Sequence, residues 1–268
     1  MNNMIKAVGV VGLLGVSSGA IAASAGGVHW NPNDVDDFAM QFNFTQWYTS
    51  SADAIGSGVN LAPDFGAAQS VPGGLLVGNS TLTGVGEVYS INGTGPAVFC
   101  PGCELTTVFG GVLLAGFDVT DPLAPLPLFD LSSAFINIYV DFIPPGDYPW
   151  PSDASNQADV DAAADGELWL SLGFDTFDFQ GTVESGFVNS LQTVTGGLAA
   201  SYFIGGSQPG GFDAQYGASA FFTAARPLYS QSGNGQFKAD TVPEPTTLAL
   251  LGLSLLGFSS RLLRRKAA

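Results

Sequence analysis

Apolar and polar side chains alternate with a period of two along several segments of this chain, a period that fits the two faces of a β-strand. The clearest segment is 134–143, where one face carries Ile136, Ile138, Val140 and Phe142. Gly, Pro, Asn and Asp separate the alternating segments at intervals of roughly 10–15 residues, a spacing typical of β-rich domains. We therefore predict an all-β single domain, built as an antiparallel β-sandwich or a jelly-roll-like fold.

Other segments extend the same prediction. Segment 38–44 alternates, and in 167–174 the period predicts one shared face for Leu168, Leu170, Leu172 and Phe174. Further candidate strands are 75–77, 85–91, 105–119, 174–181, 199–204 and 219–224. The proline-rich stretch 121–129 is expected to be an extended connector. A long loop is expected over 142–166, with a short helix possible in 152–164 behind Ser152 or Asp153 as N-cap.

The N-terminus has the pattern of a secretory signal peptide over residues 1–22. Lys6 precedes the apolar stretch 7–16, and small residues follow up to the triplet Ala20-Ile21-Ala22. We expect cleavage after Ala22 or a few residues later. The alternative, a membrane anchor, fits less well because the apolar stretch is too short to span a bilayer. The domain itself then covers residues 23–241, with no linker that divides it.

The C-terminal segment 242–268 combines a stiff turn, an apolar run and a basic tail. Pro243 and Pro245 favour extended backbone on either side of Glu244. Residues 246–263 are apolar apart from small hydroxyls and Arg261, and as a helix they would span about 27 Å, close to a hydrocarbon core of about 30 Å. We predict a transmembrane helix with its basic end in the cytoplasm. The alternative, a short core helix, would leave these cations without partners.

This tail resembles the PEP-CTERM sorting signal of Gram-negative bacteria. The resemblance rests on Val242, on Pro243-Glu244-Pro245, on the apolar stretch 248–258, and on Arg264, Arg265 and Lys266. It implies recognition by an exosortase-type membrane transpeptidase, cleavage near the Pro-Glu-Pro, and release or attachment at the cell surface. It also implies a link to exopolysaccharide and to biofilm or floc formation. Residues 100–111 are similar to a short stretch of flocculation-type PEP-CTERM proteins.

The charge of the predicted domain argues against nucleic acid and anionic lipid as its partners. Only Arg226 and Lys238 of the seven basic residues lie between the two processed ends, together with 22 of the 23 acids, since Glu244 is in the tail. Two positive charges against 22 negative ones leave a net charge of −20. Such a surface repels nucleic acid and anionic lipid and attracts divalent cations. The membrane is therefore expected as a partner only through the C-terminal helix, before processing.

The two cysteines stand close together, as Cys100-Pro-Gly-Cys103. In an exported protein we expect them to form a disulfide across the turn that Pro101-Gly102 favours. A thioredoxin-like redox pair would need its first cysteine at a helix N-terminus, whereas residues 104–111 read as a strand. A metal site with two thiols alone would lack a second ligand pair.

Acidic residues in the predicted long loop make calcium the one cofactor that the sequence suggests. Their carboxylates are the hard oxygen ligands that Ca²⁺ prefers, and the candidates are Asp153, Asp159, Asp161 and Asp165. The spacing does not match an EF-hand, and a solvated acidic loop remains the alternative. In the same loop, Tyr148 and Trp150 are candidates for stacking on sugar rings, against the alternative of ordinary packing.

Together these features predict an exported, non-enzymatic protein of the cell surface or extracellular matrix. His29 is the only histidine, which argues against a Ser-His-Asp triad or a histidine-rich zinc site. Two alternatives stay open. One is a calcium-dependent carbohydrate-binding module with extracellular polysaccharide as its partner. The other is a secreted glycoside hydrolase with paired carboxylates, although no particular pair stands out.

Overall fold

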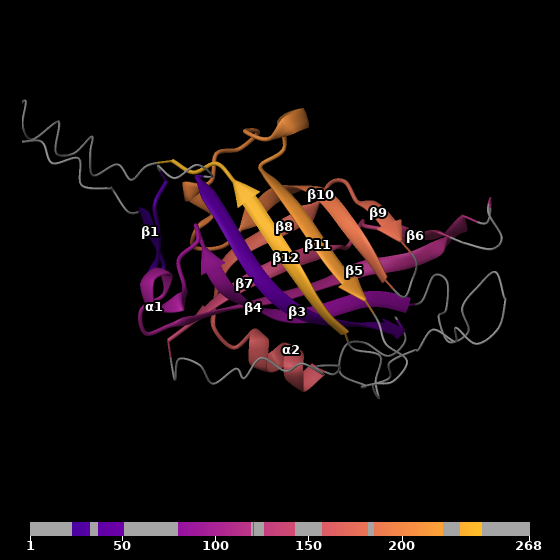
Figure 1. The fold of residues 1–268 in the computed structure, drawn as a ribbon, viewed down its shortest axis with the longest axis horizontal. Helices are drawn as coiled ribbons and strands as arrows, with labels where there is room; N and C mark the ends of the chain where they lie inside the picture. The colour runs from indigo at the N-terminus through magenta and orange to yellow at the C-terminus, as the bar shows by residue number, and fades with distance from the viewer. Residues whose placement is uncertain are drawn as a thin grey trace, which may run out of the picture.

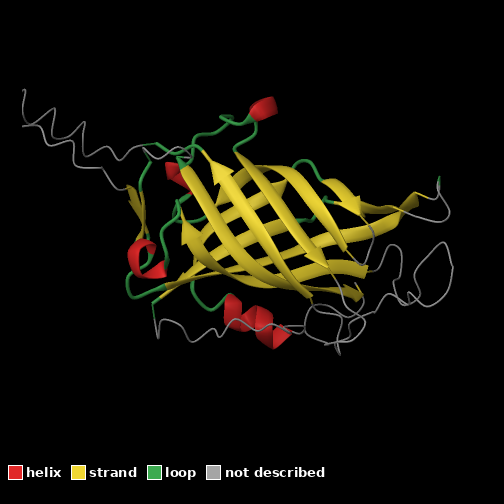
Figure 2. Ribbon diagram, in the orientation of Figure 1, coloured by secondary structure: helices red, strands yellow, loops and turns green. Residues whose placement is uncertain are grey.

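The computed structural model describes residues 23–32, 37–50, 80–118, 120, 126–142, 157–181, 185–221 and 231–242. Strands dominate these ranges (Figures 1 and 2). The strands are β1 (Ala23–Ala25), β2 (Val28–Trp30), β3 (Phe38–Ser50), β4 (Ser80–Ile91), β5 (Glu104–Asp118), β6 (Leu126–Asp130), β7 (Phe135–Asp141), β8 (Glu167–Phe174), β9 (Asp178–Gly181), β10 (Ser185–Gly196), β11 (Ala214–Phe221) and β12 (Gln231–Ala239). The helices are α1 (Pro96–Phe99) and α2 (Gln157–Ala163), with 3-10 turns η1 (Ala200–Tyr202) and η2 (Pro209–Gly211).

Eight of the strands form a closed antiparallel barrel. The pairing order runs β3-β4-β5-β7-β8-β10-β11-β12, and β12 pairs back with β3, so the sheet has no free edge along this circuit. The fold class was therefore predicted correctly as antiparallel all-β, but the sandwich or jelly-roll arrangement was wrong. The reason is that each strand pairs with its successor around the circuit, whereas a sandwich or jelly roll divides its strands between two sheets.

The predicted alternation is confirmed in β7 and broken by a bulge in β8. Ile136, Ile138 and Val140 are buried on one face of β7, whereas Phe142, just beyond it, is 47% exposed. In β8 the register slips, so that Ile138 pairs with Leu170 but Tyr139 pairs with Leu168. Trp169 is the extra residue of this bulge and is fully buried. The prediction that Leu168 shares the face of Leu170 was therefore wrong, because one inserted residue moves the next side chain to the other face.

Glycines make room for large rings inside the barrel. Phe44 lies between Gly233 on β12 and Gly86 on β4 in the strand registers. A Cβ atom on Gly233 would lie 2.3 Å from the Phe44 ring, and one on Gly84 would lie 2.2 Å from the ring of Phe109. An eight-stranded barrel is only just wide enough for its own side chains, so each ring needs a small residue beside it.

One end of the barrel is filled by aromatic residues and covered by the β1–β2 hairpin. Phe38 stacks on Trp169 at 5.9 Å between ring centroids and meets Phe203 edge-on at 5.2 Å. The indole N–H of Trp169 donates to the carbonyl of Ala25 on β1 at 2.8 Å. Trp30 on β2 packs edge-on against Phe38 at 5.5 Å. We call this the closed end of the barrel; it lies at the left of Figure 1, beside β1.

Helix α2 packs outside the barrel, below it in Figure 2. Its buried residues Val160 and Ala163 cover a second, smaller apolar cluster made by Trp47, Val85 and Val108. The hydroxyl of Thr106 on β5 donates to the carbonyl of Ala163, which fixes the end of the helix. The short helix predicted within 152–164 is thus present at 157–163, whereas both predicted caps lie outside the described residues.

Two segments differ from their predicted form. Residues 199–204 were predicted as a strand, but they contain the 3-10 turn η1, which begins after Ala199 and sits against the closed end. The expected connector 121–129 is a paired strand, β6, from Leu126 onward, and residues 121–125 lie outside the described residues, as does the candidate strand 75–77. Proline is tolerated in β6 because this strand pairs on one side only.

Candidate functional site

The chain leaves the barrel at the closed end through a short, well-anchored segment. Thr241 is 2% exposed and accepts a hydrogen bond from the indole N–H of Trp30 at 3.2 Å. The backbone N–H of Val242 donates to the carbonyl of Tyr202 at 2.8 Å. Thr241 and Val242 therefore belong to the folded domain.

The chain enters the domain at the same end. Ala23 and Ala25 are buried, and Ala23 pairs with Trp30 in the β1–β2 hairpin. Because Trp30 also contacts Thr241, the first and last described segments meet at one residue. Ala23 and Val242, the described residues next to the two predicted processing points, thus both lie at the closed end of the barrel.

The outer face of four strands carries uncharged polar side chains. Two rows cross β10, β11, β12 and β3 in register; the first holds Phe187, Ser219, Asn234 and Asn43, and the second Asn189, Gly217, Gln236 and Gln41. Phe187 is 43% exposed, and Tyr89 on β4, at the other side, is 41% exposed. Most of these residues line one shallow depression. We call these eight positions and Tyr89 the amide face.

The half of the barrel away from the closed end contains an apolar cavity. Aromatic rings make up much of its lining, which includes Phe44, Phe109, Phe129, Phe174, Phe177, Phe179 and Tyr216. Polar side chains contribute little, through Gln46 and Ser185. Burial raises the pKa of the Tyr216 phenol, so this group stays neutral. One layer nearer the closed end, Gln192 is fully buried, and its side-chain amide has no hydrogen-bond partner among the described residues.

The comparisons with known proteins bear on the C-terminal segment. Residues 241–266 match the family described as the PEP-CTERM protein-sorting motif. The chain carries a PEP-CTERM sorting motif. The match begins at Thr241, the anchored residue at the closed end. No curated protein and no solved structure matches the chain.

The PEP-CTERM motif indicates an exported protein that is targeted to and processed by an exosortase. Of the predicted motif residues, Val242 lies in the described part of the chain, whereas Pro243, Glu244, Pro245, Arg264, Arg265 and Lys266 lie outside it, as does the predicted signal peptide. Among the described residues, no helix combines the length and apolar character needed to cross a membrane.

The predicted cysteine pair forms a disulfide. Cys100 and Cys103 are bonded, with their Cα atoms 5.1 Å apart, and the N–H of Cys103 donates to the carbonyl of Cys100 at 3.1 Å. Cys100 follows helix α1 as its C-cap, and β5 begins at Glu104. The first cysteine is therefore not at a helix N-terminus, where a redox-active thiol is stabilised. The bond closes the turn between α1 and β5.

The calcium and stacking residues are only partly described. Asp159 and Asp161 lie on α2, two positions apart, so their side chains leave the helix on different sides. Asp161 accepts a hydrogen bond from the Gln157 side chain at 2.6 Å. Within the described ranges, no three His, Cys, Asp or Glu side chains gather as metal ligands. Asp165 lies just after α2, between the helix and β8. Asp153, Tyr148 and Trp150 lie outside these ranges, so the calcium site and the sugar-stacking site remain predictions.

Sequence reasoning missed the amide face and the cavity. The amide face depends on which strands become neighbours, because its residues come from positions as far apart as Gln41 and Gln236. A signal did exist for the cavity: Phe174, Phe177 and Phe179 lie within six consecutive residues, where the strand pattern is short and interrupted.

Proposed function

We propose that this chain is the precursor of a non-enzymatic surface or matrix protein of a Gram-negative bacterium, and that the delivered product is the barrel. In this proposal the product serves exopolysaccharide-linked biofilm or floc formation by holding a neutral polysaccharide on the amide face. The observation that carries the glycan part is the pair of in-register rows of Asn, Gln and Ser side chains across β10, β11, β12 and β3.

The chemistry of the amide face suits sugar hydroxyls. Each Asn or Gln side chain offers two N–H donors and a carbonyl acceptor, so it can pair with hydroxyls that both donate and accept. Phe187 and Tyr89 expose apolar ring surface at the two sides of the face. None of the eight positions in the two rows is charged, although Glu87 on β4 pairs with Asn43 at the end of the first row and the domain as a whole carries −20. A neutral glycan can approach these rows, whereas an anionic one is repelled by the domain.

The proposal shares carbohydrate binding with one of the two alternatives, the calcium-dependent carbohydrate-binding module. In that alternative calcium acts through the acids around α2 and not on the amide face itself, so glycan binding is measured both with and without calcium. No acid pair in the described residues gives a specific reason to favour a glycoside hydrolase.

Truncation tests the sorting part of the proposal. A stop after Val242 removes the rest of the motif but keeps the Val242 N–H that bonds to Tyr202. We expect the truncated protein to be exported and folded but absent from its normal surface or matrix fraction, with a loss of flocculation. A truncated protein that reached the same fraction and supported the same aggregation would contradict the proposal.

A binding assay tests the glycan part. The host's own exopolysaccharide is separated into neutral and acidic fractions, and each is bound to the processed protein with calcium and with a chelator. We expect the neutral fraction to bind, and the double variant Asn234→Ala/Gln236→Ala to bind at least tenfold more weakly. Thr193→Ala/Thr195→Ala is the matched control, because these two exposed polar residues lie two positions apart on β10 and outside the amide face. Equal binding by the double variant and the control would contradict the proposal that the amide face binds the polysaccharide.

A further inference from the structure

The barrel wall has a seam next to the cavity. The second half of β5 pairs with β6, and the first half of β10 pairs with β9, so these short strands replace β7 and β8 at this level. No pairing joins β6 to β9 among the described strands. Phe129 on β6 instead meets Phe177 and Phe179 edge-on, at 5.4 and 5.5 Å between ring centroids. Here the wall is closed by rings rather than by backbone hydrogen bonds.

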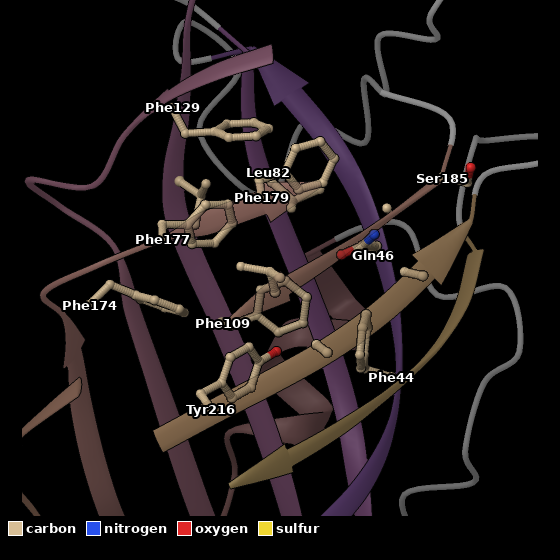
Figure 3. A pocket seen from close by; sticks show the side chains of 15 residues that line it. Phe44, Gln46, Leu82, Phe109, Phe129, Phe174, Phe177, Phe179, Ser185 and Tyr216 are labelled. Carbon is tan, nitrogen blue, oxygen red and sulfur yellow. The ribbon is translucent and has the colours of Figure 1, made fainter. Parts of the chain in front are cut away.

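Such a seam can open at low cost. A pair of aromatic rings contributes about 0.5–1.5 kcal/mol beyond its buried area, and rings can change rotamer without disturbing a strand ladder. In Figure 3, Phe129, Phe177 and Phe179 lie together at one side of the cavity, and Gln46 and Ser185 lie at the other. The lining thus has an aromatic side at the seam and a small polar side.

The size of the cavity restricts what it can hold. The cavity volume is about 60 Å³. An engineered apolar cavity that binds benzene measures about 150 Å³. A sugar ring or a polycyclic molecule therefore does not fit. An unbranched hydrocarbon chain is narrow enough to enter, but it fits only as far as the rings at the seam move aside and lengthen the space. Gln46 is the polar group available for the head of such a molecule.

We propose that the barrel binds the unbranched alkyl chain of a small amphiphile in this cavity, with the chain among the Phe rings and the polar head toward Gln46. Barrels of eight strands either fill their interior with side chains or hold one small ligand, and this barrel does the first at its closed end and the second beyond it. Lining residues lack charge, so the bound part of the ligand is uncharged. This site is separate from the amide face and does not depend on glycan binding.

Calorimetric titration of the processed protein with hexan-1-ol, octan-1-ol and decan-1-ol, below their solubility limits, tests the proposal with uncharged head groups. Burying one methylene contributes about 0.8 kcal/mol, so affinity should rise by up to about fourfold per added methylene until the cavity is full. Absence of binding by all three alcohols, or an affinity that does not depend on chain length, would overturn the proposal.

Variants locate the binding in the cavity. Ala220→Leu places a larger side chain into the lining and should weaken decan-1-ol binding at least tenfold. Gln215→Leu, on the exposed face of the same strand but outside the amide face and the cavity, should leave that affinity unchanged. Leu82→Ala enlarges the cavity and should favour longer chains, which keeps the test decisive if Ala220→Leu fails to fold. Equal affinities of Leu82→Ala and the parent for every chain length would place binding elsewhere and contradict the proposal.

Discussion

The indole N–H of Trp30 donates a hydrogen bond to Oγ1 of Thr241, and this contact joins two residues 211 positions apart in the chain. Trp30 belongs to the hairpin that begins at Ala23, and Thr241 is the first residue of the PEP-CTERM match. The two ends of the folded domain are thus fastened to each other at the closed end. The half of the barrel that holds the cavity lies away from these joined ends.

Removing one partner of this contact should destabilise the whole domain. Thr241→Val leaves the buried indole N–H without an acceptor, and we expect the free energy of unfolding to fall by about 1–3 kcal/mol. Trp30→Phe removes the donor as well as some ring volume. Denaturant titration of both single variants and the double variant measures the coupling between the two residues. Strict additivity of the two losses would show that the hydrogen bond contributes nothing.

The glycines beside the interior rings should resist substitution. Gly233→Ala brings a Cβ atom to 2.3 Å from the Phe44 ring, and we expect a loss of about 1–3 kcal/mol in stability from overpacking. Gly196→Ala is the matched control, because nothing lies within 4 Å of its added Cβ. Adding Phe44→Leu to Gly233→Ala should recover part of the loss. If the two alanine variants melt at the same temperature, the crowding described here is wrong.

Glu87 should lower stability at neutral pH. Partial burial raises the pKa of Glu87 above its ordinary value of 4.5. The folded state then binds this proton more tightly than the unfolded state does, so stability falls as pH rises from 4.5 through the raised pKa and the full cost is present above it. Glu87→Gln removes the titrating group and should raise the melting temperature at pH 7 more than at pH 4. An equal change at both pH values would contradict this assignment.

The sequence predicted the strands better than their arrangement. The period of two in 135–141 reports local burial, and the structure confirms it through Ile136, Ile138 and Val140. Closure of the barrel depends on the pairing of β12 with β3, for example of Gly235 with Phe42. Nothing local to either residue indicates that pairing. The bulge at Trp169 was hidden for a similar reason, because the partner of its indole N–H, the carbonyl of Ala25, is 144 positions away in the chain.

The candidate sites also differ in whether the sequence alone could reveal them. The tail and the Cys100–Cys103 disulfide are encoded by contiguous residues, so both could be read from the sequence. The amide face and the cavity are assembled from strands distant in the chain. The period of two indicates that Asn234 and Gln236 share a face, but only the fold shows that Gln41 joins them.

The position of signal-peptide cleavage can be narrowed. Cleavage a few residues after Ala22 was one expectation, but Ala23 and Ala25 are buried in the β1–β2 hairpin. Removal of either would expose the aromatic residues beneath them. We therefore expect the mature chain to begin at Ala23, as N-terminal sequencing of the exported protein would show. A start at Gly26 or beyond would mean that β1 is dispensable.

The central claim is that processing at the C-terminal end delivers the barrel without its tail, and the intact mass of the protein recovered from the cell surface or matrix tests it most directly. The account predicts a single chain that begins at Ala23 and ends near Pro243-Glu244-Pro245. Deletion of the exosortase should remove this species from the surface or matrix fraction. A recovered mass that still includes residues 246–268 would contradict it.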